Sequence, residues 1–120
     1  SEVLFPSGGS DLNEAGQAEM GKLATALLDL AKEIPSEINW VLRVDGHTDN
    51  VPLSGTGRYR DNWELSSARA TSVVKFLISK GVPADRLVAA GFGEFQPIAE
   101  GSDDAARATN RRIELKLTEK

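Results

Sequence analysis

Three charged residues occupy positions where a small domain usually places apolar or turn residues. Asp49 lies in a glycine-containing turn that follows an alternating, strand-like segment. Arg69 lies four residues after Leu65 and four before Val73, which puts it on or beside the apolar face of a predicted helix. Arg111 shares the parity of the apolar residues in the last strand-like segment, so its side chain is expected to face inward. One carboxylate and two guanidinium groups are therefore directed towards the interior or its edge.

Such a set of charges has two interpretations, and the residues alone leave both open. In the first, Asp49 forms an internal ion pair with Arg69 or Arg111 and fixes the loop that follows it. In the second, the carboxylate accepts a ligand ammonium group and an arginine binds a ligand carboxylate through two parallel hydrogen bonds. Each charge-assisted bond contributes about 1.5–3 kcal/mol. The head group of a free amino acid has the charges that such a clamp would hold.

Catalytic and metal-binding patterns do not emerge from the sequence. The chain has one histidine and no cysteine, and it lacks both a nucleophile elbow and a calcium-binding loop of the EF-hand type. The glycine-rich run at 54–57 lacks the lysine of a phosphate-binding loop. We therefore predict a non-enzymatic domain with no catalytic residue, no metal and no cofactor. His47 is interpreted as a turn residue that forms local hydrogen bonds.

The overall composition is that of an ordinary folded domain. The chain has 120 residues, of which 40% are hydrophobic and 27% charged, so residues 1–120 are expected to form one domain. The formal net charge of −4 argues against a nucleic-acid partner and against an anionic membrane surface. No apolar run approaches the roughly 20 residues of a membrane span. We expect the domain to be excised from a longer, membrane-anchored protein and to meet a membrane only through a preceding part.

The elements that must position these charges alternate between strands and helices. Capping boxes are predicted at Asp11–Glu14 and Asp61–Glu64, and the two helices should end at Pro35 and before Gly81. The predicted strands are 3–5, 38–45 with one face buried, 86–92 and 112–118, with a helical turn at 103–108. The order β-α-β-α-β-β predicts an α+β fold in which two or three helices pack on one face of a mixed four-stranded sheet. Trp40 is expected in the core. Trp63 is expected to pack against the long loop, with sugar stacking as the alternative.

Four motifs in a fixed order carry a family resemblance. They are Val44-Asp45-Gly46-His47-Thr48-Asp49, Asn62-x-x-Leu65-Ser66-x-x-Arg69-Ala70-x-x-Val73, Gly91-Phe92-Gly93-x-x-x-Pro97 and Asn110-Arg111-Arg112-Ile113-Glu114. Together they resemble the OmpA-like C-terminal domain, shared by OmpA, MotB and Pal proteins, over about residues 5–117. This resemblance implies non-covalent binding of peptidoglycan in the periplasm, with attachment to the inner or outer membrane through the parent protein.

The resemblance also assigns roles to individual residues. It implies that Asp49 and Arg69 hold the diaminopimelate side chain of a peptidoglycan stem peptide, with Arg111 supporting Asp49 or meeting the ligand. The remaining positions that the resemblance places around the ligand are Thr48, Asn62, Leu65 and Ser66. The rival interpretation is a structural or protein-interaction domain in which Asp49 and Arg69 form an internal salt bridge. A wall amidase is disfavoured by the single histidine.

The segment between Asp49 and Asn62 departs from the pattern of the porin and lipoprotein members. It is longer here and is similar to the MotB branch, whose members anchor the flagellar motor stator to the wall. That branch also tends to dimerise, so a homodimer is an expected partner. Stator and outer-membrane tether remain the two alternatives for the parent protein.

Overall fold

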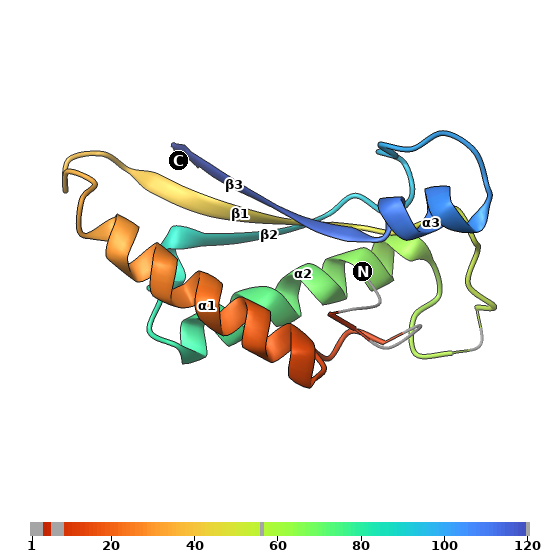
Figure 1. Ribbon diagram of the computed structural model, residues 1–120, viewed down its shortest axis with the longest axis horizontal. Coiled ribbons are helices and arrows are strands. Elements are labelled where there is room, and N and C mark those ends of the chain that lie inside the picture. The colour runs from red at the N-terminus through yellow and green to blue at the C-terminus, as the bar shows by residue number, and fades with distance from the viewer. Residues whose placement is uncertain (1–3, 6–8, 56, 120) are drawn as a thin grey trace.

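The computed structural model describes residues 4–5, 9–55 and 57–119 (Figure 1). Two long helices cover one face of a sheet, and a short helix lies at one end of it (Figure 1). None of the helices in the described residues combines the length and apolar character that crossing a bilayer requires. The elements are α1 (Glu14–Ala31), β1 (Trp40–His47), α2 (Asn62–Ser79), the 3-10 turn η1 (Ala84–Arg86), β2 (Leu87–Gly91), α3 (Asp104–Asn110) and β3 (Arg112–Glu119).

The sheet is mixed, and its described strands are three in the order β2-β1-β3. β1 runs parallel to β2, with Val44 opposite Ala89, and antiparallel to β3, with Val44 opposite Leu115. The α+β class and the mixed sheet are confirmed, but the four-stranded sheet is not. Of the expected first strand at 3–5, Val3 lies outside the described residues, and residues 4–5 form a turn and a bend.

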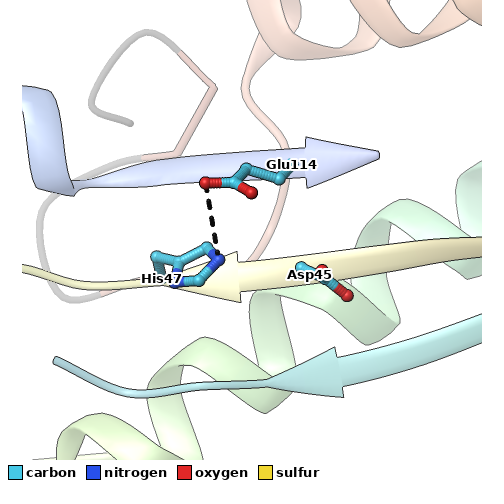
Figure 2. A group of neighbouring side chains, drawn as sticks. All are labelled: Asp45, His47 and Glu114. Carbon is cyan, nitrogen blue, oxygen red and sulfur yellow. Dashed lines mark ion pairs between the residues drawn. The ribbon is translucent and has the colours of Figure 1, made fainter. Parts of the chain in front are cut away.

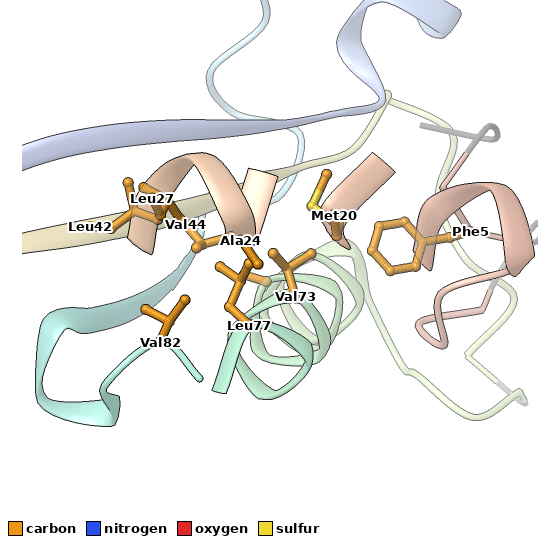
Figure 3. Close-up of a cluster of buried hydrophobic side chains, with 10 residues drawn as sticks. Phe5, Met20, Ala24, Leu27, Leu42, Val44, Val73, Leu77 and Val82 are labelled. Carbon is orange, nitrogen blue, oxygen red and sulfur yellow. The ribbon is translucent and has the colours of Figure 1, made fainter. Parts of the chain in front are cut away.

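The core lies between the two long helices and the sheet (Figure 3). α1 and α2 each bury one stripe of side chains at helical spacing. Every second side chain of β1 points to the helix-covered face and is buried there. Burying a side chain of this size contributes about 1.5–3 kcal/mol. The central members are Phe5, Met20, Ala24, Leu27, Leu42, Val44, Ala70, Val73, Leu77 and Val82.

β1 differs from its prediction because both of its faces are covered. The alternation predicted one solvent-facing side, yet Asp45 is 1% and His47 is 5% exposed. The strand also begins at Trp40, two residues later than predicted, since a turn with a hydrogen bond from the Ile38 amide to the Pro35 carbonyl precedes it. Trp40 is buried, as predicted.

Caps set the helix boundaries. The cap of α1 is Asn13, whose Oδ1 accepts from the Gly16 amide at 2.7 Å, so the capping box predicted at Asp11 is wrong. α1 ends at Ala31, before Pro35. The cap of α2 is Asp61, as predicted, because its Oδ1 accepts from the Glu64 amide at 2.9 Å.

The C-terminal end of α2 also follows its prediction. Lys80 is its C-cap, and Gly81 comes next with φ +103°, a conformation that favours glycine. The helical turn expected at 103–108 is the short helix α3, capped by Asp103.

Candidate functional site

Apart from Arg69, the predicted site residues lie on segments that meet where the parallel strands β1 and β2 both end. The loop after β1, the loop after β2, the start of α2 and helix α3 meet at this end of the sheet (Figure 1). The amide of Phe92 donates to the Gly46 carbonyl at 3.0 Å, and the amide of Thr48 donates to the Gly93 carbonyl at 2.9 Å. These bonds continue the pairing beyond the strands. They fix Thr48, and therefore its neighbour Asp49, beside the loop that follows β2.

Helix α2 crosses the strand ends at very short range. A Cβ atom at Gly46 would lie 2.2 Å from the backbone oxygen of Ser66, and one at Gly91 would lie 2.6 Å from the backbone nitrogen of Ser67. Only glycine permits this approach. Ser66 is fully buried, and its Oγ accepts from the Gly93 amide at 2.9 Å. Ser66 thus joins α2 to the loop that holds Thr48.

Asp49 is held by two donors. Its Oδ2 accepts from Arg111 Nη1 at 2.7 Å, and its Oδ1 accepts from the Val51 amide at 3.0 Å. The side chains of Asp49 and Arg111 are 13% and 21% exposed. Among the described ion pairs, Asp49 is joined to Arg111, which the parity of Arg111 allowed. This is one of the two internal ion pairs that the structural interpretation allowed, and Arg111 rather than Arg69 is the arginine in it.

Asn62 connects three segments at the start of α2. Its Nδ2 lies 3.3 Å from the carbonyl of Asp49, 3.1 Å from the carbonyl of Val51 and 3.4 Å from Oε1 of Glu94. The hydroxyl of Thr48 also donates to the Asp49 carbonyl at 2.9 Å. Hydrogen bonds therefore hold the backbone carbonyl of Asp49 as well as its side chain.

Arg69 lies on the same buried stripe of α2, about 10 Å along the helix axis from Asn62. Its side chain is 5% exposed, its Nε donates to the Gly9 carbonyl at 2.8 Å, and its guanidinium group lies 5.1 Å from the centre of the Phe5 ring. Leu65, on the same stripe, is buried at 4% exposure. The structure therefore places Arg69 beneath the segment that precedes α1.

Sequence reasoning missed several contributors to this region. Ser10 is buried, and its hydroxyl bonds to that of Tyr59, which joins the segment before α1 to the loop before α2. No local pattern signalled this contact or the one between Gly9 and Arg69. Glu94 was also missed, although it directly follows the Gly91-Phe92-Gly93 motif and could have been considered on that ground.

A second polar cluster lies on the sheet face opposite the long helices (Figure 2). Asp45 accepts from Arg43 Nε at 2.7 Å and Nη2 at 2.9 Å, and Glu114 accepts from Arg112. His47 Nε2 lies 3.8 Å from Glu114 Oε2. His47 is predicted to be a turn residue with local hydrogen bonds, but it is the last residue of β1, and neither ring nitrogen has a hydrogen-bond partner among the described residues. Instead, the ring stacks on Phe92 at 5.0 Å between centroids.

The composition of this cluster invites comparison with a metal site. Ligand atoms of Asp45, His47 and Glu114 all lie within 4.8 Å of one another. Each carboxylate already accepts from a guanidinium group, however, and a cation would have to displace both Arg43 and Arg112. We therefore interpret the cluster as two ion pairs, one along β1 and one along β3, that lie side by side on the second face of the sheet.

This cluster predicts an acid-sensitive fold. Burial, followed by the charge of Arg112, lowers the pKa of His47, so the unfolded chain binds this proton more readily than the folded domain. The free energy of unfolding should therefore fall as pH drops through the ordinary histidine pKa of about 6.5. The hydrogen bond from Arg112 lowers the pKa of Glu114, which extends the loss below the ordinary pKa of glutamate.

The measurement is urea unfolding at several pH values between 8 and 5. His47 is the only histidine of the chain, so His47→Gln should flatten the slope between about pH 7 and 5. An unchanged slope in that variant would assign the acid sensitivity to other groups.

The sequence and the structure were compared with known proteins. Residues 4–111 match the OmpA family. Outer membrane protein A of Serratia odorifera is 38% identical over 115 residues, which cover 95% of this chain and 43% of that protein. The periplasmic domain of Helicobacter pylori MotB superposes with a TM-score of 0.80 at 29% identity, covering 99% of this chain and 78% of that one. The peptidoglycan-associated lipoprotein of Burkholderia pseudomallei gives a TM-score of 0.72 at 25% identity, covering 95% and 85%.

These likenesses confirm the resemblance drawn from the four motifs, including its MotB-like form. The chain spans less than half the length of the outer membrane protein A that it matches. The matched range includes the strand ends, the start of α2 and Arg111, which together build the site. The chain belongs to the OmpA family.

Proposed function

We propose that this domain binds peptidoglycan without covalent chemistry and anchors its parent protein to the cell wall. The observation that carries the proposal is the carboxylate of Asp49. It is partly exposed, and Arg111 and the Val51 amide hold it in one orientation. A preorganised carboxylate loses little freedom when it binds a cationic group. The relative from Burkholderia pseudomallei, named for its association with peptidoglycan, supports this choice of ligand.

The chemistry of a diaminopimelate side chain matches the two charges in question. Its ammonium group would bind Asp49, and its carboxylate would bind the planar guanidinium group of Arg69. Thr48 and Asn62 hold the backbone of Asp49, and Ser66 holds the loop after β2 that in turn bonds to Thr48. Arg111 orients Asp49. No bond is broken in this process, and no cofactor takes part.

The setting of the domain follows from its relatives. A periplasmic domain of MotB and a peptidoglycan-associated lipoprotein share its fold, so we place it in the periplasm, attached to the inner or outer membrane through the parent protein. A single stem-peptide contact should be weak. Several copies, or a homodimer of the kind expected for a flagellar stator, would raise retention on a polymeric wall through effective concentration.

The test is co-sedimentation with purified diaminopimelate-type sacculi. The wild-type domain should sediment, free meso-diaminopimelate should release it, and Asp49→Ala should stay in the supernatant while remaining folded by circular dichroism. Asp85→Ala removes an exposed carboxylate from η1 and should sediment like the wild type. Wild-type protein that stays in solution, or Asp49→Ala that binds as well as the wild type, would refute the proposal.

A second candidate is a protein-interaction domain, and the ion pair between Asp49 and Arg111 is the observation in its favour. In that case the pair only fixes the loop at 50–61, which would hold a protein partner. Asp49→Ala would then lower the free energy of unfolding and leave sedimentation unchanged. The same experiment therefore separates the two functions.

A further inference from the structure

Two large aromatic side chains are exposed beside the proposed stem-peptide site. Trp63, the second residue of α2, is 50% exposed, and Phe95, in the loop after β2, is 56% exposed. Their rings stack with centroids 5.0 Å apart and planes 26° apart. Each ring is thus partly covered by the other and partly open to solvent. Trp63 is predicted to pack against the loop at 50–61, and the ring contact that the structure gives it is with Phe95.

The backbone beneath the pair is fixed. Gly93 has φ +61°, and a Cβ atom there would lie 3.3 Å from the Phe95 ring and 3.4 Å from the Trp63 ring. The amide of Gly93 donates to Ser66 Oγ, and its carbonyl accepts from the Thr48 amide, both at 2.9 Å. The segment that supports the two rings therefore also positions Thr48 beside Asp49.

The pair is continuous with the Asp49 site through its chain neighbours. Asn62, which precedes Trp63, and Glu94, which precedes Phe95, bond to each other, and Asn62 also contacts the Asp49 carbonyl. The Asn62–Glu94 pair therefore links the Asp49 site to the segments that carry the two aromatic rings. In peptidoglycan the stem peptide is covalently attached to a sugar. The sugar ring therefore lies only a few peptide residues from the group bound at Asp49, and each residue of an extended peptide spans about 3.5 Å.

We propose that the Trp63–Phe95 pair binds a pyranose ring of the glycan chain that carries the stem peptide. This inference rests on the proposed function and adds a sugar subsite to it. A pyranose ring presents a face of C–H groups that can lie on an aromatic ring, and its hydroxyl groups need polar partners at the edge. Half-exposed aromatic side chains provide such a surface at a small cost in side-chain entropy.

Polar partners are available next to the pair. A cavity of about 340 Å³ lies at this end of the molecule, and its lining includes Thr48, Asn50, Glu94 and Ser102. Asn50 Nδ2 donates to Ser102 Oγ at 2.8 Å, so the loops at 50–61 and 92–103 meet there. Carboxylate, amide and hydroxyl groups of this kind are suited to hydrogen bonding with sugar hydroxyls.

The test compares two soluble probes by calorimetry. One is a diaminopimelate-containing tripeptide, and the other is the same tripeptide carrying its disaccharide. The wild-type domain should bind the disaccharide probe about three- to tenfold more tightly. Trp63→Ala should abolish that preference without changing the affinity for the bare tripeptide, and Trp63→Phe should keep most of it. Ile98→Ala, which removes an exposed apolar side chain of the same loop, should change neither value.

Tryptophan fluorescence provides a direct readout. Trp40 is 7% exposed and Trp63 is 50% exposed, so an emission change caused only by the disaccharide probe is assigned to Trp63. Equal wild-type affinity for both probes would overturn the sugar subsite and leave the proposed function intact. An equal loss of affinity for both probes in Trp63→Ala would overturn it as well. So would a Trp63→Ala variant that changes from dimer to monomer but still prefers the disaccharide probe. Failure of the wild type to bind either probe would overturn the function and the subsite together.

Discussion

Gly46→Ala is expected to lower the free energy of unfolding by more than about 3 kcal/mol. The added methyl group would lie 2.2 Å from the carbonyl oxygen of Ser66 and 3.0 Å from its carbon. Both atoms are helix backbone, so no side chain can rotate away to relieve the contact. Relief requires α2 to move off β1, which would open the core that these elements enclose.

Urea unfolding monitored by circular dichroism measures this effect. Gly21→Ala is the matched control, because Gly21 lies inside α1 and has open space around its Cβ position. Alanine there should stabilise the domain by about 0.5–1 kcal/mol. Tolerated core changes cost about 1 kcal/mol or less. If the free energy of unfolding of Gly46→Ala lies that close to the wild-type value, the close crossing of α2 over β1 is wrong.

Local periodicity predicted most of the elements because it reports which face of an element is buried. The alternation at 112–118 corresponds to β3, and the apolar stripe of the second helix corresponds to α2. The α1 cap was assigned to Asp11, whereas Asn13 forms it and its amide also donates to the Leu4 carbonyl. This bond joins residues nine positions apart, so a local capping pattern cannot predict it, and it helps to set the start of the helix.

The second face of β1 shows where such reasoning fails. Arg43, Asp45 and His47 are polar and alternate with apolar residues, which by itself predicts a solvent-facing side. In the folded domain Asp45 lies opposite Glu114 and His47 opposite Arg112, and ion pairs with arginines neutralise both carboxylates. Burial of these groups depends on the pairing of strands that lie far apart in the sequence.

The site was predictable to a similar degree. The parity of the last strand directed Arg111 inward, and Arg111 does contact Asp49. The helical spacing of Arg69 placed it on the buried stripe of α2, which is also observed. Its hydrogen bond to Gly9 spans 60 residues of sequence, and only the assembled fold reveals it. Charge and periodicity therefore identified the groups, whereas their partners depended on tertiary contacts.

Arg69→Ala is expected to lose about 2–4 kcal/mol of stability together with sacculus binding. The substitution removes a donor to the partly buried Gly9 carbonyl and the group that packs over Phe5. Loss of binding in that variant would therefore be ambiguous. Arg69→Lys resolves it, because lysine keeps the charge and most of the packing but lacks the planar fork that matches a carboxylate.

We expect Arg69→Lys to remain folded, with its thermal midpoint within a few degrees of the wild type, and to bind sacculi more than tenfold less tightly. Arg86→Lys is its matched control. Arg86 also donates to a backbone carbonyl, that of Trp40, and lies over an aromatic ring, yet it sits at the opposite end of the sheet. Arg86→Lys should bind like the wild type.

Binding retained in Arg69→Lys would show that the guanidinium geometry is not used. An equal loss of binding in both variants would show that any weakening of arginine packing reduces binding. Only a loss confined to Arg69 supports a carboxylate bound at that position.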